Sequence, residues 1–322
     1  MRRPALVGIL AAVLQFAPAL CGGAAALDRA HLHISVGLSP NTLLYRYAID
    51  KGFYAEEGLE VLPVQAGMLP GIQGLAAGSF DASQILGQGA GAILRGLPLK
   101  IVMVFDTRPL NWLYANRNIK SLRELRGKQI AVSSFGAALD QMTRELLAKN
   151  GLDPQRDVIL RALEPTPTRL AALMTGAVDA AVLNQMDALI AKKNGLTELL
   201  FYGAELEFVA AGAVVAEKTI AERPDFLGRF LRGTLKSLYW FKSSEAEAVG
   251  RLARSMKISA REAAEVYQAT RRTMSADGTI PRALQEKMIA QQRKTLKIER
   301  EVAPEQVYDF TPLRAAIKEL GR

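Results

Sequence analysis

The sequence predicts a two-lobed α/β protein with mainly parallel sheets, helices on both faces and a C-terminal helical arm. Its 322 residues suffice for two domains with separate cores, and a hydrophobic content of 49% indicates a globular chain. Two further observations carry this prediction: the chain contains an internal repeat, and strand and helix patterns alternate within each copy.

The repeated segments are LAAGSFDASQIL (75–86) and LMTGAVDAAVLN (173–184), which share Leu, Gly, Asp and Ala at four positions. Each copy follows an earlier apolar strand, HISVGL near 32–38 and KQIAVSS at 128–134. Each half then contains four strand patterns separated by three helix patterns, and such alternation gives parallel sheets covered by helices. The alternative is that Gly-x-hydrophobic-Asp-Ala, a common strand-entry pattern, recurs by chance.

The C-terminal third has a different pattern. GAVVAEK (212–218) predicts a strand that returns to the first lobe, and Pro224 opens a long amphipathic helix. Two chain crossings, near 107–117 and 204–212, predict a hinge. The expected organisation is a signal peptide (1–26), the first part of lobe one (27–114), lobe two (115–205), and a return strand with the helical arm (206–322).

The first residues resemble a secretory signal. Arg2 and Arg3 precede a short apolar stretch, and the small residues Ala24 and Ala26 predict cleavage after about Ala26, which gives a periplasmic protein. An uncleaved anchor is the alternative. Cys21 is the only cysteine, and its neighbours argue against lipidation, so the mature chain has neither disulfides nor thiol chemistry.

Several function classes are disfavoured. The net charge of +9 is not gathered into a basic run with interleaved aromatic residues, so nucleic-acid binding is not expected. IAVSSFGAALDQM (130–142) lacks the Gly-Lys-Ser/Thr of a nucleotide loop. His31 and His33, the only histidines, are expected on a solvated N-terminal strand. No His–nucleophile pair, metal site or cofactor is therefore expected.

A ligand site is expected where the carboxyl ends of the strands of both lobes face each other. The loops there offer hydroxyls, amides and helix N-termini, which suit an anion. The candidate ligand-binding residues are Ser39, Asn41, Thr42, Gly87, Gln88, Trp112, Ser133, Ser134, Gly136, Ala137, Asn184 and Gln185.

Each candidate has a simpler explanation. The serines, Asn41 and Thr42 can serve as helix caps, the glutamines can be merely solvated, and Trp112 can be a core residue. Arg108 pairs either with an anionic ligand or with Asp106. Asp140 lies in a first helical turn, where a carboxylate is favourable by itself.

Four segments resemble the periplasmic substrate-binding proteins of ABC importers, in the group for sulfonate, taurine and nitrate that includes relatives similar to thiamine-precursor proteins. They are GFYAEEGLEV (52–61), GIQGLAAGSFDAS (71–83), LRGKQIAVSSFGAALDQMTRELLAKNGLDP (125–154) and LAALMTGAVDAAVL (170–183). The resemblance covers about 32–245. It implies the type II periplasmic binding protein fold, whose cleft loops match the candidate residues above.

The resemblance also implies the function and the partners. A monomer of this kind captures a small organic anion, such as a sulfonate, a taurine-like compound or a carboxylate, and delivers it to the transmembrane permease of an ABC importer. Enzymes on the same fold use cysteine or histidine, which this chain lacks inside its lobes, so we expect a non-enzyme. A secreted enzyme and a ligand-binding module for a membrane sensor stay open as alternatives.

Overall fold

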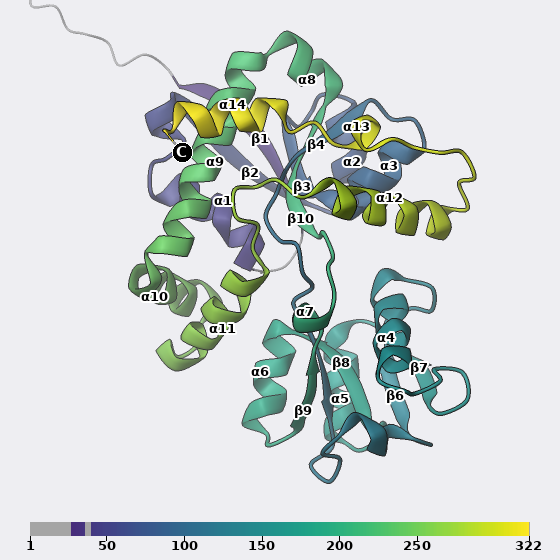
Figure 1. The fold of residues 1–322 in the computed structure, drawn as a ribbon. Helices are drawn as coiled ribbons and strands as arrows, with labels where there is room; N and C mark the ends of the chain where they lie inside the picture. Colours follow the sequence, from purple (N-terminus) through teal and green to yellow (C-terminus); the bar gives the residue numbers. More distant parts are fainter. Residues whose placement is uncertain (1–26, 36–39, 322) are drawn as a thin grey trace, which may run out of the picture.

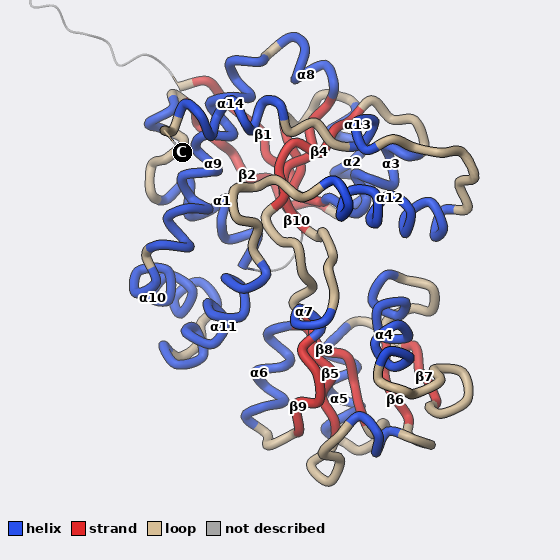
Figure 2. The backbone as a smooth tube through the Cα atoms, viewed as in Figure 1, coloured by secondary structure: helices blue, strands red, loops and turns tan. Residues whose placement is uncertain are grey.

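The computed structural model describes residues 27–35 and 40–321 and consists of two α/β lobes joined by two chain crossings (Figure 1). In each lobe the strands form a central sheet with helices on both sides (Figure 2). The predicted two-lobed α/β fold is confirmed. The predicted signal peptide lies outside the described residues. In the described part of the chain, no helix combines the length and apolar character that crossing a membrane requires.

Lobe one is built on a five-stranded sheet in the order β2-β1-β3-β10-β4. β1 pairs in parallel with β2 and β3, whereas β10 is antiparallel to both of its neighbours, so four strands share one direction. The elements are β1 (Asp28–Ser35), α1 (Pro40–Asp50), η1 (Ala55–Glu57), β2 (Leu59–Ala66), α2 (Met68–Ala76), β3 (Ala82–Ile85), α3 (Leu86–Leu94), β4 (Leu99–Val104) and β10 (Ala211–Ala216).

Lobe two repeats this arrangement in the order β7-β6-β8-β5-β9, with β5 as the one reversed strand. The repeat that the sequence shows therefore corresponds to a repeated sheet. The elements are β5 (Asn111–Ala115), η2 (Leu122–Leu125), β6 (Gln129–Val132), α4 (Ala138–Lys149), β7 (Ile159–Ala162), α5 (Thr166–Met174), β8 (Ala180–Asn184), α6 (Gln185–Lys193), β9 (Thr197–Phe201) and α7 (Tyr202–Glu205).

The reversed strands correct one predicted boundary. Residues 111–114 were expected to end lobe one, but they belong to β5, which pairs with β8 and β9 in the second sheet. The chain thus leaves lobe one directly after β4, and it returns through β10, which inserts between β3 and β4. The sequence cannot show this, because an apolar strand fits either sheet equally well.

The C-terminal helices pack mainly on lobe one. α9 buries an apolar face against α1 and α14, and Ser237 Oγ donates a hydrogen bond to Leu44 O at 2.7 Å. Ser259 and Glu262 form a capping box at the start of α11. The elements are α8 (Glu217–Glu222), α9 (Pro224–Ser243), α10 (Glu245–Met256), α11 (Ala260–Thr273), α12 (Arg282–Leu296), α13 (Pro304–Val307) and α14 (Thr311–Glu319).

His33 differs from the sequence prediction of a solvated histidine. Its side chain is fully buried in β1, and its Nδ1 lies 2.8 Å from Ser83 Oγ. Nε2 lies 3.2 Å from Ala66 O. Because a carbonyl oxygen can only accept, Nε2 donates to it, and Nδ1 accepts a hydrogen bond from the Ser83 hydroxyl. A His–Ser pair does exist, contrary to expectation. Both side chains are inaccessible to solvent, so the pair joins β1 to β3 and is not arranged for catalysis.

The insertion of β10 yields a stability prediction. A Cβ at Gly212 would lie 2.0 Å from the backbone oxygen of Met103 on β4, and backbone atoms cannot move aside as a flexible side chain can. We expect Gly212→Ala to lower the free energy of unfolding by about 3 kcal/mol or more, measured by chemical denaturation.

The matched control is Gly228→Ala, in the second turn of α9. Its Cβ would meet only the tip of the Arg232 side chain, at 3.6 Å, so alanine should stabilise the helix by about 1 kcal/mol. Equal effects of the two substitutions would contradict the close approach of β10 to β4.

Candidate functional site

The two chain crossings run side by side at the position where the hinge was predicted. Phe208 N donates to Thr107 O at 2.9 Å, and Ala211 N donates to Asp106 Oδ1 at 3.0 Å. Arg108 Nη1 donates to Gly203 O at 3.1 Å. The guanidinium of Arg108 therefore ties the first crossing to the start of the second, a contact that the sequence did not predict.

Lobe two also contacts the C-terminal arm, through α6 of the lobe and α11 of the arm. Lys192 pairs with Glu265 at 2.7 Å, and Lys193 pairs with Glu262 at 2.6 Å. Gln185, at the start of α6, donates from Nε2 to Val266 O at 3.1 Å and is buried. Figure 1 shows the two helices next to each other. α11 thus holds one side of lobe two against the rest of the molecule.

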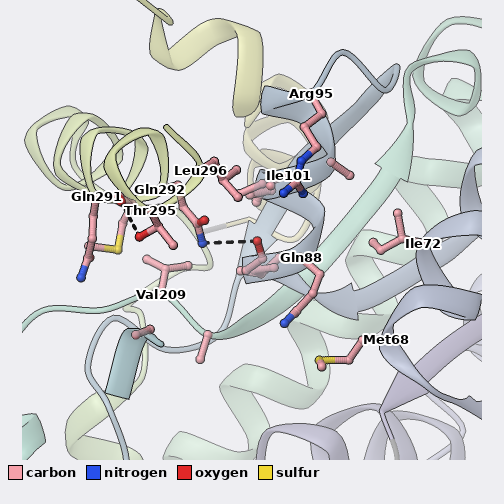
Figure 3. Close-up of a pocket in the computed structure, with 18 of the residues that line it drawn as sticks. Met68, Ile72, Gln88, Arg95, Ile101, Val209, Gln291, Gln292, Thr295 and Leu296 are labelled. Carbon is pink, nitrogen blue, oxygen red and sulfur yellow. Dashed lines mark hydrogen bonds between the residues drawn. The ribbon is translucent and has the colours of Figure 1, made fainter. Parts of the chain in front are cut away.

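On the other side of lobe two, α4 approaches α12. Gln141 Nε2 donates to Thr295 Oγ1 at 3.3 Å across the gap between the lobes. A cavity of about 800 Å³ opens here, with walls from α2, α3, α12, the second crossing and the first residues of α4 (Figure 3). Because both lobes contribute, a ligand in this cavity would bridge them.

The cavity is lined mainly by apolar side chains, with amides as its chief polar groups. Met68, Ile72, Ile101, Val209 and Leu296 are among the apolar residues. Of the described residues that line it, only Arg95 is charged, and its side chain is exposed at one side of the cavity. The amide-bearing residues are Gln73, Gln88, Gln141, Gln291 and Gln292. Elsewhere in the described chain, no cluster of three or more His, Cys, Asp or Glu could hold a metal ion.

Comparison with known proteins identifies the family to which this chain belongs. The model of the NMT1/THI5-like family matches residues 39–248, which is more than half of the chain. The chain belongs to the NMT1/THI5-like family. A curated relative is the riboflavin-binding protein RibY of Chloroflexus aurantiacus, 28% identical over 207 residues. That match covers 60% of this chain and 57% of RibY, so the chain spans little more than half of the length of this relative.

Solved structures share the fold of this NMT1/THI5-like chain. The periplasmic sulfonate-binding protein SsuA of Methylobacillus flagellatus superposes with a TM-score of 0.75 at 17% identity, covering 92% of this chain and 96% of that one. The desulfurization enzyme DSZB superposes with a TM-score of 0.67 at 14% identity, covering 91% and 99%. Binding proteins and an enzyme are therefore both found on this fold.

Of the candidates predicted in lobe one, two line the cavity. They are Gly87 and Gln88, at the start of α3. Thr42 is fully buried and accepts a hydrogen bond from Gln84 Nε2 at 3.0 Å, so it is not available to a ligand. Ser39 lies outside the described residues, and nothing is described of the side chain of Asn41.

The candidates in lobe two are mostly engaged with their own lobe. Ser134 N donates to Glu164 Oε1 at 3.3 Å, and Gly136 N donates to Asp140 Oδ2 at 2.9 Å. Asn184 caps α6 by accepting from Asp187 N at 2.9 Å. The loop N–H groups of Ser134 and Gly136 thus already have carboxylate acceptors, and Asn184 occupies one N–H group in the first turn of α6. An anion at either of the two loop N–H groups would have to displace a negative charge.

The remaining candidates are placed as follows. Ser133 is buried, and its Oγ has no hydrogen-bond partner among the described residues, while Ala137 is the N-cap residue of α4 without a side-chain cap. Trp112 was expected near the hinge of lobe one. It lies instead in β5, only 8% exposed and stacked on Phe201 with ring centroids 4.8 Å apart, which makes it part of the core of lobe two.

No residue of α12 was predicted to lie at the site, yet this helix supplies several residues to the cavity: Met288, Gln291, Gln292, Thr295 and Leu296. α12 lies after residue 248, outside the segment that the NMT1/THI5-like model matches. Gln291, Gln292 and Thr295 are uncharged polar residues in a helix whose other polar residues are mostly charged. That contrast was the only available indication, and it does not specify what the helix faces.

The contact between α6 and α11 yields a prediction about pH. Hydrogen bonds from Lys193 and from Ser259 lower the pKa of Glu262 from 4.5 to about 2. The ionised carboxylate therefore stabilises the folded state above pH 4.5, and this contribution disappears as the pH falls to about 2. We expect Lys193→Met to raise the pKa of Glu262, measured by an NMR titration of its carboxyl carbon.

Lys218→Met is the control for this titration. Lys218 pairs with Glu222 at 3.6 Å in α8, far from α11 in the fold, and its loss should leave the pKa of Glu262 unchanged. If Lys193→Met also leaves it unchanged, α6 and α11 do not stay in contact in solution.

Proposed function

We propose that this chain is a periplasmic solute-binding protein that captures a small organic molecule between its lobes and delivers it to an ABC permease. The observation that supports this most is the cavity of about 800 Å³, with walls from both lobes. Its volume lies within the range of about 300–1,000 Å³ that is usual for sites of small organic ligands. A cleaved signal peptide and a monomeric state belong to the same proposal.

Closure about the hinge is the proposed response to ligand. A ligand shifts the equilibrium only if it makes contacts in the closed state that the open state lacks. Phe135 is 58% exposed on the loop before α4, while Met68 and Leu69 are 53% and 67% exposed at the start of α2. Burying these apolar side chains against a ligand would favour the closed form.

Two ligand classes are proposed, and different observations favour them. The apolar walls favour an organic solute with an apolar body, and the name of the relative RibY, a riboflavin-binding protein, supports that choice. Arg95 beside the cavity favours a small organic anion, such as a sulfonate, a taurine-like compound or a carboxylate, and the name of SsuA supports it. The first is preferred because the loop N–H groups of Ser134 and Gly136 already have carboxylate acceptors, and Asn184 already caps α6.

Catalysis is the competing function, since DSZB is named an enzyme. We expect no turnover: residues 27–322 contain no cysteine, and the His33–Ser83 pair is buried in the sheet of lobe one. Conversion of a bound solute by the purified protein would favour the enzyme. Neighbouring genes for a permease and an ATPase would favour transport over delivery of the ligand to a membrane sensor.

Native mass spectrometry and thermal unfolding test the proposed function. We expect freshly purified protein to carry a copurified solute, which names the ligand class directly. In a panel of riboflavin, taurine, methanesulfonate and benzoate, the matching class should raise the melting temperature, because a ligand at 100 times its Kd stabilises the folded state by about 2.7 kcal/mol. A protein that carries no solute and that no small organic compound stabilises would contradict solute binding.

A further inference from the structure

α12 lies against α3 so closely that its side chains form one wall of the cavity. A Cβ at Gly91 would lie 3.7 Å from Leu296 Cδ1, and a Cβ at Gly87 would lie 4.0 Å from Gln292 Nε2. The glycines of α3 therefore leave room for the side chains of α12. Gln292 Nε2 donates to Gly87 O at 3.4 Å, which fixes this side chain at the edge of the cavity (Figure 3).

Two further amides at the cavity have no hydrogen-bond partner among the described residues. The side chains of Gln88 on α3 and Gln291 on α12 make no hydrogen bond to any described residue, although both line the cavity. Gln141 of lobe two also lines the cavity and is held to Thr295 of α12. The amide groups on the cavity wall therefore come from both lobes and from the arm.

An amide carries one acceptor and two donor hydrogens, so it is best matched by a ligand that also offers both kinds of group. An oxyanion only accepts hydrogen bonds. It would leave the oxygens of the amides unpaired once closure removes them from water, and an unmade buried hydrogen bond is costly. The apolar remainder of the walls suits a flat, mostly apolar body.

We propose that α12 selects the ligand: Gln291 and Gln292 bind the polar edge of a flat, mostly apolar solute that carries neighbouring N–H and C=O groups. This inference rests on the proposed function. It assigns a role to a helix beyond residues 39–248, the segment that the family model matches.

Three bicyclic probes of similar size test whether the site recognises the polar edge of the ligand. 2-Quinolone offers N–H and C=O side by side, 1-methyl-2-quinolone keeps only the acceptor, and naphthalene-2-sulfonate replaces the edge by an oxyanion. Calorimetric titration of the full mature chain should give the lowest Kd for 2-quinolone. We expect about a tenfold weaker binding of the methylated probe, which is the usual effect of one lost hydrogen bond.

The double variant Gln291→Leu/Gln292→Leu tests the helix itself. It should weaken binding of 2-quinolone about tenfold or more, reduce the difference between 2-quinolone and its methylated form, and keep the melting temperature of the unliganded protein. The matched control is Lys294→Leu, on the same helix but exposed and outside the cavity, which should bind as the wild type does.

The outcomes separate this inference from the proposed function. Equal binding of 2-quinolone by the wild type and the double variant, or preference for naphthalene-2-sulfonate, overturns the role of α12 while solute binding stands. Failure of all three probes, in a protein that carries a different copurified solute, likewise overturns the ligand class alone. Failure of the probes together with the absence of any copurified solute overturns both.

Discussion

The insertion of one reversed strand into each sheet is the constraint on which the rest of the molecule depends. β10 lies between β3 and β4 although it follows the whole of lobe two in the chain, and β5 lies between β8 and β9 although it comes before them. The sheet of lobe one is complete only after the chain has crossed to lobe two and returned, whereas all five strands of lobe two lie between the two crossings. The two crossings then run side by side and are joined by hydrogen bonds.

The C-terminal arm contacts lobe two on two sides. α11 holds α6 through two ion pairs and a buried hydrogen bond, while α12 meets α4 on the other side of lobe two. Only the second contact borders the cavity. There, Gln141 and the wall formed by α12 face the same space.

The candidate site was predictable only in part, and Gly87 and Gln88 belong to the part that was predictable. They begin a helix directly after a strand of a parallel sheet, and that position faces the ligand side in any such fold. Ser134, Gly136 and Asn184 occupy similar positions in lobe two, yet acceptors from their own lobe use the available N–H groups. The position of a residue in the sequence determines where its loop emerges from the sheet. It does not determine which acceptor forms a hydrogen bond with the N–H groups of that loop.

The sequence by itself determined the fold class, the repeat and the order of elements, because these follow from local apolar periodicity and from helix caps such as Ser259 and Glu262. Only the tertiary structure decided the sheet to which β5 belongs, the burial of His33 and the position of α12 against α3. Each of these depends on contacts between residues far apart in the chain. Such contacts produce no periodic pattern in a single sequence, because an apolar or small residue can pack against many different partners.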